Sequence, residues 1–175
     1  MTIVNDEVLA MVGVKGSVMV APLPLDASTL RRFVHGVMEG NPVHWDEAAA
    51  QASRYGQVVA PPLWPSHAFV RPPGSAGDPL EQLLIDEDWD GAAGQVFGQL
   101  PPVPISVGRL LNGGVSAEFY QLPAIGDVIS AQSEYVEIVE REGRAGPMVI
   151  VRVLTVYRNQ HDHLLSHITN SLIYR

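Results

Sequence analysis

The chain has 175 residues, 46% of them hydrophobic and 17% charged, which suits one folded domain and argues against a disordered segment. Its net charge of −8, with only 11 lysines and arginines, argues against nucleic-acid binding, and the absence of cysteine excludes disulfides and cysteine-ligated metals. No apolar run approaches the roughly 20 residues of a membrane-spanning helix, and residues 1–6 do not resemble a signal peptide, so we expect a cytoplasmic protein.

The first part of the chain, about residues 1–70, has the pattern of a short strand followed by helices. The strand is expected at residues 16–22. Apolar spacing, alanine content and proline positions predict three helices, at 29–37, 47–54 and 63–70. Asp26 or Ser28 can cap the first of these, and Gly40 is expected to end it.

The middle part, residues 71–104, is rich in proline and glycine and carries an acidic stretch at residues 86–90. Such a long connection inside one domain is typical of a lid, a binding loop or a poorly ordered segment. We therefore expect a single domain over residues 1–175 with an insertion at about 71–104.

The last part of the chain alternates between long apolar-patterned runs and polar turns. Strands are expected at 105–111, 115–122, 128–139, 148–157 and 164–174. The turns between them fall at 112–114, 126–127, 143–146 and 159–163. This order predicts one bent antiparallel meander with a helix lying on it, an α+β arrangement.

One segment combines groups that can do chemistry, namely residues 39–46, Glu-Gly-Asn-Pro-Val-His-Trp-Asp. Glu39 and His44 stand on either side of the turn that Asn-Pro forms, so they can converge on one water molecule. A carboxylate and an imidazole in that arrangement supply general acid–base catalysis. Alternatively, Glu39 is a residue of a helix end and His44 closes the loop by a hydrogen bond.

This segment resembles the Asp-x-Asn-Pro-x-His-x-Asp signature of MaoC-like and (R)-specific enoyl-CoA hydratases. The alanine-rich run after it is similar too, and the Tyr55–Pro62 run resembles the N-terminal, FAS1-like type of MaoC dehydratase domain. Further similar features follow in order: Asn112-Gly113-Gly114, Glu118-Phe119-Tyr120, Gly126-Asp127, Gly143–Pro147 and Leu172–Arg175. The likeness covers most of residues 15–175, and the middle part fits poorly.

The resemblance implies a hot-dog fold, in which a curled antiparallel sheet wraps around a central helix, here Leu63–Val70. It also implies pairing of chains through their sheets, as a homodimer or with another hot-dog chain. Glu39 and His44 would hold the catalytic water, and Asn41 would brace the loop. The substrate would be an acyl-CoA or acyl carrier protein thioester, with no metal and no other cofactor.

Two positions depart from the family pattern. Glu39 replaces the usual aspartate and is one methylene longer. Pro62 stands where the hydratases place a glycine whose N–H faces the thioester carbonyl, and proline has no N–H. The donor to the carbonyl would then have to be Leu63, at the amino end of the expected helix, or the substrate must be held in another way.

Aromatic and histidine side chains elsewhere admit two interpretations. Trp64 and His67 can line an acyl pocket, although aromatics at such spacing are also typical of a plain core. His161, His163 and His167 suggest zinc at first sight, but their setting is typical of a hairpin tip, and we expect no metal site there.

Two functions from different classes follow. The first is a hydratase/dehydratase that interconverts 2-enoyl and (R)-3-hydroxyacyl thioesters. The alternative is a non-catalytic hot-dog subunit that pairs with an active partner and shapes its acyl-binding site. A hot-dog thioesterase is a weaker third hypothesis, because the helix at 63–70 lacks the acidic group that such enzymes use.

Overall fold

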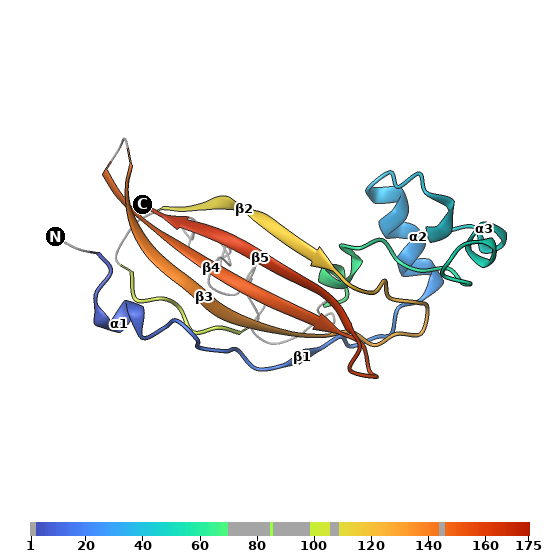
Figure 1. The fold of residues 1–175 in the computed structure, drawn as a ribbon, viewed down its shortest axis with the longest axis horizontal. Coiled ribbons are helices and arrows are strands. Elements are labelled where there is room, and N and C mark those ends of the chain that lie inside the picture. Colours follow the sequence, from blue (N-terminus) through green and yellow to red (C-terminus); the bar gives the residue numbers. More distant parts are fainter. Residues whose placement is uncertain (1–2, 70–84, 86–98, 106–108, 144–145) are drawn as a thin grey trace.

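A computed structural model describes residues 3–69, 85, 99–105, 109–143 and 146–175. Most of the expected insertion, and Val70, lie outside these residues. In the described part, one antiparallel sheet with the strand order β1-β3-β4-β5-β2 dominates the molecule (Figure 1). Its strands are β1 (Met19–Val20), β2 (Leu110–Phe119), β3 (Ser130–Gly143), β4 (Gly146–Arg158) and β5 (Leu164–Tyr174).

The two hairpins that join β3, β4 and β5 are where the sequence predicted them. Gly143 is paired with Gly146 at the first tip. At the second, the Asn159 side-chain oxygen accepts hydrogen bonds from the backbone N–H groups of His161 and His163, both at 3.0 Å. A side-chain amide that replaces backbone partners in this way fixes the turn, so the predicted meander is confirmed for β3-β4-β5.

The prediction is wrong for β2. This strand pairs with β5 and lies at the edge of the sheet, not beside β3. The expected turn at residues 112–114 is a bulge inside β2: Asn112 is paired with Leu172 and Val115 with Asn170, so the register shifts between them.

Glycine is required at both bulge positions, for different reasons. Gly114 has a φ of +107°, a conformation that other residues rarely adopt. A Cβ on Gly113 would lie 3.0 Å from the Ser171 carbonyl oxygen on β5. The Asn112 side chain accepts a hydrogen bond from the N–H of Gly114 at 2.8 Å and holds the bulge. Asn-Gly-Gly therefore continues the strand instead of reversing it.

Alternate residues of the long strands are buried against the rest of the chain. On β4, Val149, Val151 and Val153 are fully buried, in the period of two that a strand requires. They belong to one hydrophobic cluster, with Val8, Leu100, Val103, Tyr135, Ile138 and Leu172. A second cluster at the other end of the sheet contains Leu25, Leu30, Val34, Trp64, Ile129, Tyr157, Leu165 and Ile168.

The helical segments are short. They are α1 (Asp6–Leu9), α2 (Ala27–Gly36), α3 (Glu47–Ala52) and the 3-10 turns η1 (Pro42–His44) and η2 (Trp64–His67). Figure 1 shows α2 and α3 beyond one end of the sheet, so the expected helix lying on the sheet is not formed by either of them. None of the described helices is long and apolar enough to cross a membrane.

The expected central helix at Leu63–Val70 is also wrong over its described residues. Only the four residues of η2 are helical, and they make i to i−3 bonds such as Trp64 N–H to the Pro61 carbonyl at 2.9 Å. A missing N–H is tolerated in the first turn of a helix, but Pro65 also disfavours the α-helical conformation of Trp64, the residue before it. An α-helix that begins at Leu63 is therefore disfavoured.

Candidate active site

The loop that carries the motif begins where α2 ends. Asp26 caps the start of α2 as predicted, and hydrogen bonds from the Thr29 side chain and backbone lower the pKa of its carboxyl. The predicted end at Gly40 is wrong. The chain leaves the helix at Met38, whose φ is +53°, while the N–H of Glu39 bonds to the Val34 carbonyl at 2.9 Å.

Glu39 and Asn41 hold the turn that follows. The Glu39 carboxylate is half-buried and accepts a hydrogen bond from the N–H of Asn41 at 2.9 Å. The Asn41 side chain in turn accepts one from the N–H of Val43 at 3.3 Å and caps η1. Both side chains thus have partners in the loop backbone, and the turn presents His44 at the end of η1.

His44 is the buried member of the motif, with 5% of its surface exposed. Its Nδ1 lies 2.8 Å from the carbonyl oxygen of Val59. A carbonyl can only accept a hydrogen bond, so Nδ1 carries the proton and the neutral ring has its lone pair on Nε2. Val59 is itself held by a bridge to Ala124. The imidazole is therefore oriented as a base on Nε2.

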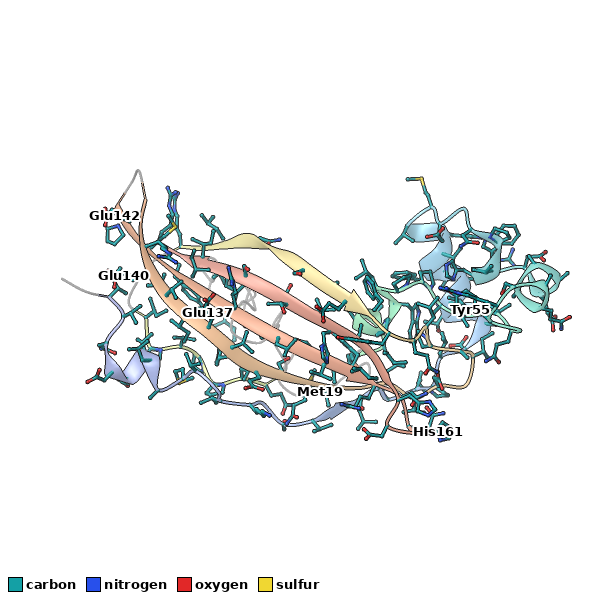
Figure 2. All side chains as sticks on the ribbon, in the orientation of Figure 1. Met19, Tyr55, Glu137, Glu140, Glu142 and His161 are labelled. Carbon is teal, nitrogen blue, oxygen red and sulfur yellow. The ribbon has the colours of Figure 1, made fainter. Side chains whose placement is uncertain are left out.

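A pocket of about 600 Å³ lies beside this ring. Its walls come from α2, from the motif loop with α3, and from the segment after α3. The lining residues are Ala27, Leu30, Arg31, His35, His44, Trp45, Glu47, Gln51, Gly56, Gln57, Val58 and Ile125. The pocket is at the helical end of the molecule, where Figure 2 shows Tyr55, and far from Glu140 and Glu142 at the opposite end.

Of the residues predicted for the site, His44 lines this pocket. Glu39 does not line it, although it belongs to the same loop, and neither does Asn41. Two carboxylates thus need to be distinguished, Glu39 in the turn and Glu47 on the pocket wall. Asp46 starts α3 by accepting a hydrogen bond from the N–H of Ala49 at 2.7 Å, which places Glu47 in the first turn.

The residues predicted near the expected central helix lie outside the pocket as well. Trp64 is buried in the second cluster, and its indole N–H has no hydrogen-bond partner among the described residues. The ring of His67 packs edge-on against Phe33 of α2, with 4.7 Å between ring centres. Pro62 is half-buried and Leu63 is exposed. These side chains connect η2 with α2 and the core.

Half of the pocket residues that the sequence did not single out are polar. Arg31 and His35 line the pocket from α2, Glu47 and Gln51 line it from α3, and Gln57 lines it from the segment after α3. The spacing of four between positions 31 and 35 puts them on one helix face, but charged residues at that spacing are common on exposed helices. No group of three or more His, Asp or Glu suited to a metal ion occurs among the described residues.

The protein-family comparison decides the family. The model described as the FAS1-like dehydratase domain region matches residues 10–168. The chain belongs to this family. The expected membership of the MaoC-like hydratases and dehydratases is thereby confirmed. No curated protein matches the chain.

Solved structures show the fold of this FAS1-like dehydratase chain. The ChsH1–ChsH2 complex from Mycobacterium tuberculosis matches with a TM-score of 0.70 and 16% identity over 97% of this chain and 89% of that one. The (R)-hydratase from A. caviae involved in PHA biosynthesis matches with a TM-score of 0.58 and 19% identity, over 92% and 94%. The HadBC (3R-hydroxyacyl-ACP dehydratase) complex from M. tuberculosis gives 0.59 and 16%, over 93% and 96%.

The α+β hot-dog fold that the sequence predicted is confirmed by these likenesses. In this chain the sheet is not closed, and η2 stands where a long central helix was expected. The family is one of hydratases and dehydratases.

Proposed function

We propose that this chain is a lyase that interconverts 2-enoyl and (R)-3-hydroxyacyl thioesters by acid–base catalysis on a bound water. The observation that supports this most is His44: it is buried, it lines a pocket, and the Val59 carbonyl fixes its Nδ1 proton. Its Nε2 is then a base that needs no change of tautomer. The thioester is carried by coenzyme A or by an acyl carrier protein.

In hydration, the Nε2 of His44 accepts a proton from the water as the water oxygen bonds to C3. The electrons of the double bond move toward the thioester carbonyl, and C2 then takes up the proton that Nε2 accepted, which regenerates the base. Dehydration runs through the same steps in reverse, so a proton and the C3 hydroxyl leave together as water. One oriented acid–base group of this kind accelerates such a step by roughly 10²–10⁴.

Glu39 is proposed as the second group that holds the water, with Asn41 bracing the turn between it and His44. Its hydrogen bond from the N–H of Asn41 uses Oε1, which leaves Oε2 for the water. Glu47 is the competing carboxylate, because it lines the pocket. Glu39→Gln and Glu47→Gln differ only in which carboxylate becomes an amide, and the larger loss of turnover identifies the carboxylate that holds the water.

The thioester carbonyl is proposed to bind next to η2. Pro62 has no N–H, and the Leu63 amide donates no hydrogen bond within the described residues. Leu63 is therefore the proposed donor to the carbonyl oxygen. Trp64 and His67, on the same turn, are proposed to shape the acyl end of the site.

A specific observation favours the alternative, a non-catalytic subunit that completes the site of a hot-dog partner. Among the residues that the structure describes, strand β2 is an edge of the sheet with no strand beyond it, and it exposes Leu111, Val115 and Phe119. An unpaired edge with apolar side chains favours association with another chain. Two of the similar structures, ChsH1–ChsH2 and HadBC, are complexes of two chains. In this alternative the partner supplies the base that takes the proton from the water.

Hydration of crotonyl-CoA by the purified chain, followed by loss of enoyl-thioester absorbance, separates the two functions. A catalytic chain turns over alone, and His44→Ala lowers its rate by at least about 100-fold. If the chain is inactive alone but active when mixed with a MaoC-like companion chain, and His44→Ala leaves that activity unchanged, the lyase proposal is wrong and the subunit alternative holds.

A further inference from the structure

The pocket beside His44 has a basic wall that the proposed reaction does not use. Arg31 and His35 both line it from α2, as does Ala27 one turn earlier. Residues four apart on a helix have their Cβ atoms about 5–6 Å apart on one face. The guanidinium and the imidazole can therefore contact a single group in the pocket.

Arg31 lines the pocket and forms no ion pair within the described residues. The whole chain has 19 acidic residues against 11 lysines and arginines, so carboxylates are abundant. An arginine that lines a pocket and has no carboxylate partner keeps its N–H donors available for a ligand.

The other polar lining residues limit what that ligand group can be. They are Gln51 and Gln57, whose amides can hydrogen-bond to oxygen atoms, and Glu47, whose carboxylate repels an anion. A planar guanidinium matches carboxylate or phosphate oxygens with two parallel hydrogen bonds. The combination fits an oxyanion that is held by the α2 residues Arg31 and His35 and not by Glu47.

We propose that Arg31, with His35, binds an oxyanion of the ligand that occupies the pocket beside His44. That this ligand is a thioester rests on the proposed function, but the oxyanion site does not. Two parts of such a thioester carry the required oxygens: the phosphate of the pantetheine arm, and a carboxylate on the acyl group. The chemistry recognised is the same for both.

Titration calorimetry distinguishes the two sources without any turnover. One pair of probes is 4′-phosphopantetheine and pantetheine, and the other is succinyl-pantetheine and butyryl-pantetheine. Each pair differs by one anionic group. The proteins are the unchanged chain, Arg31→Gln and Arg32→Gln. Arg32 is the matched control, because it is the next arginine on α2 and does not line the pocket.

We expect the anionic member of one pair to bind at least about tenfold more tightly than its neutral counterpart. Arg31→Gln abolishes that difference and Arg32→Gln leaves it within twofold. Glu47→Gln strengthens binding of the same probe, a gain that misfolding cannot produce. Which pair shows the effect identifies the phosphate or the carboxylate as the source.

The proposal is overturned if neither anionic probe binds more tightly than its neutral counterpart, or if the two arginine variants weaken binding equally. Anion binding that depends on Arg31, in a chain that is inactive alone and whose His44→Ala variant leaves the activity with a companion chain unchanged, would retain the oxyanion site and reject the proposed function. The two failures are therefore distinguishable.

Discussion

A single hydrogen bond determines what His44 can do. Because its Nδ1 donates to the Val59 carbonyl at 2.8 Å, we expect the neutral Nδ1–H tautomer with a free Nε2. Long-range ¹H–¹⁵N correlation spectra of the labelled chain report the tautomer directly, and His44→Gln assigns the signals by removing them. An Nε2–H tautomer would contradict the assignment of Nε2 as the base.

At this scale the sequence predicted part of the site. His44 and the Asn41 cap follow from the Asn-Pro-x-His pattern, because that turn has few alternatives. The separation of Glu39 from the pocket wall and the presence of Arg31 and His35 there could not be predicted. Both depend on how α2 packs beside the loop, and residue spacing along one helix does not contain that information.

Among the elements, α2 ends in a conformation that its residues do not favour. Met38 has a φ of +53° and is 88% exposed, so its side chain contributes little packing in return. Glycine adopts this conformation without the steric cost. We expect Met38→Gly to stabilise the chain by about 0.5–1 kcal/mol, seen as a rise in Tm of roughly 2–4 °C.

Val37→Gly is the matched control for that substitution. Val37 has a φ of −96°, a conformation that does not require glycine. The substitution therefore increases the conformational entropy of the unfolded chain without relieving any backbone strain, and Tm falls. If Met38→Gly lowers Tm as much as Val37→Gly does, the positive φ at Met38 is not a source of strain.

The elements that the sequence predicted best are those whose residue pattern is compatible with only one local structure. Alternating apolar residues and short polar turns gave β3, β4 and β5 and their hairpins. The Asn112-Gly113-Gly114 segment is compatible with two local structures, a hairpin turn or a β-bulge. Only its pairing with β5 selects the bulge. The expected helix at 63–70 was wrong because the prediction treated proline at the helix start as tolerated, whereas Pro65 restricts the conformation of Trp64 inside the first turn.

On the scale of the whole molecule, each hydrophobic cluster buries one tyrosine, Tyr135 in the first and Tyr157 in the second. Burial raises the pKa of both hydroxyls to about 12, and for Tyr135 the nearby Tyr174 adds to the effect. Above pH 10 the unfolded chain loses these protons while the folded chain keeps them. The free energy of unfolding must therefore fall as pH rises from 10 to 12.

Urea denaturation at pH 9 and pH 11 measures this effect. We expect the free energy of unfolding to fall by roughly 1 kcal/mol for each of the two tyrosines over that interval. Tyr157→Phe has one hydroxyl fewer, so its loss over the same interval should be about half as large. Equal losses in the two proteins would show that the Tyr157 hydroxyl ionises as easily in the folded state as in the unfolded state.

Catalysis by His44 is the central claim, and the rate of crotonyl-CoA hydration by the unchanged chain and by His44→Asn tests it most directly. The asparagine amide can still donate to the Val59 carbonyl from near the Nδ1 position, but it has no base at Nε2. We expect a folded variant with a Tm close to that of the unchanged chain and a rate at least about 100-fold lower. Turnover by the unchanged chain that His44→Asn preserves would contradict the assignment of His44 as the catalytic base.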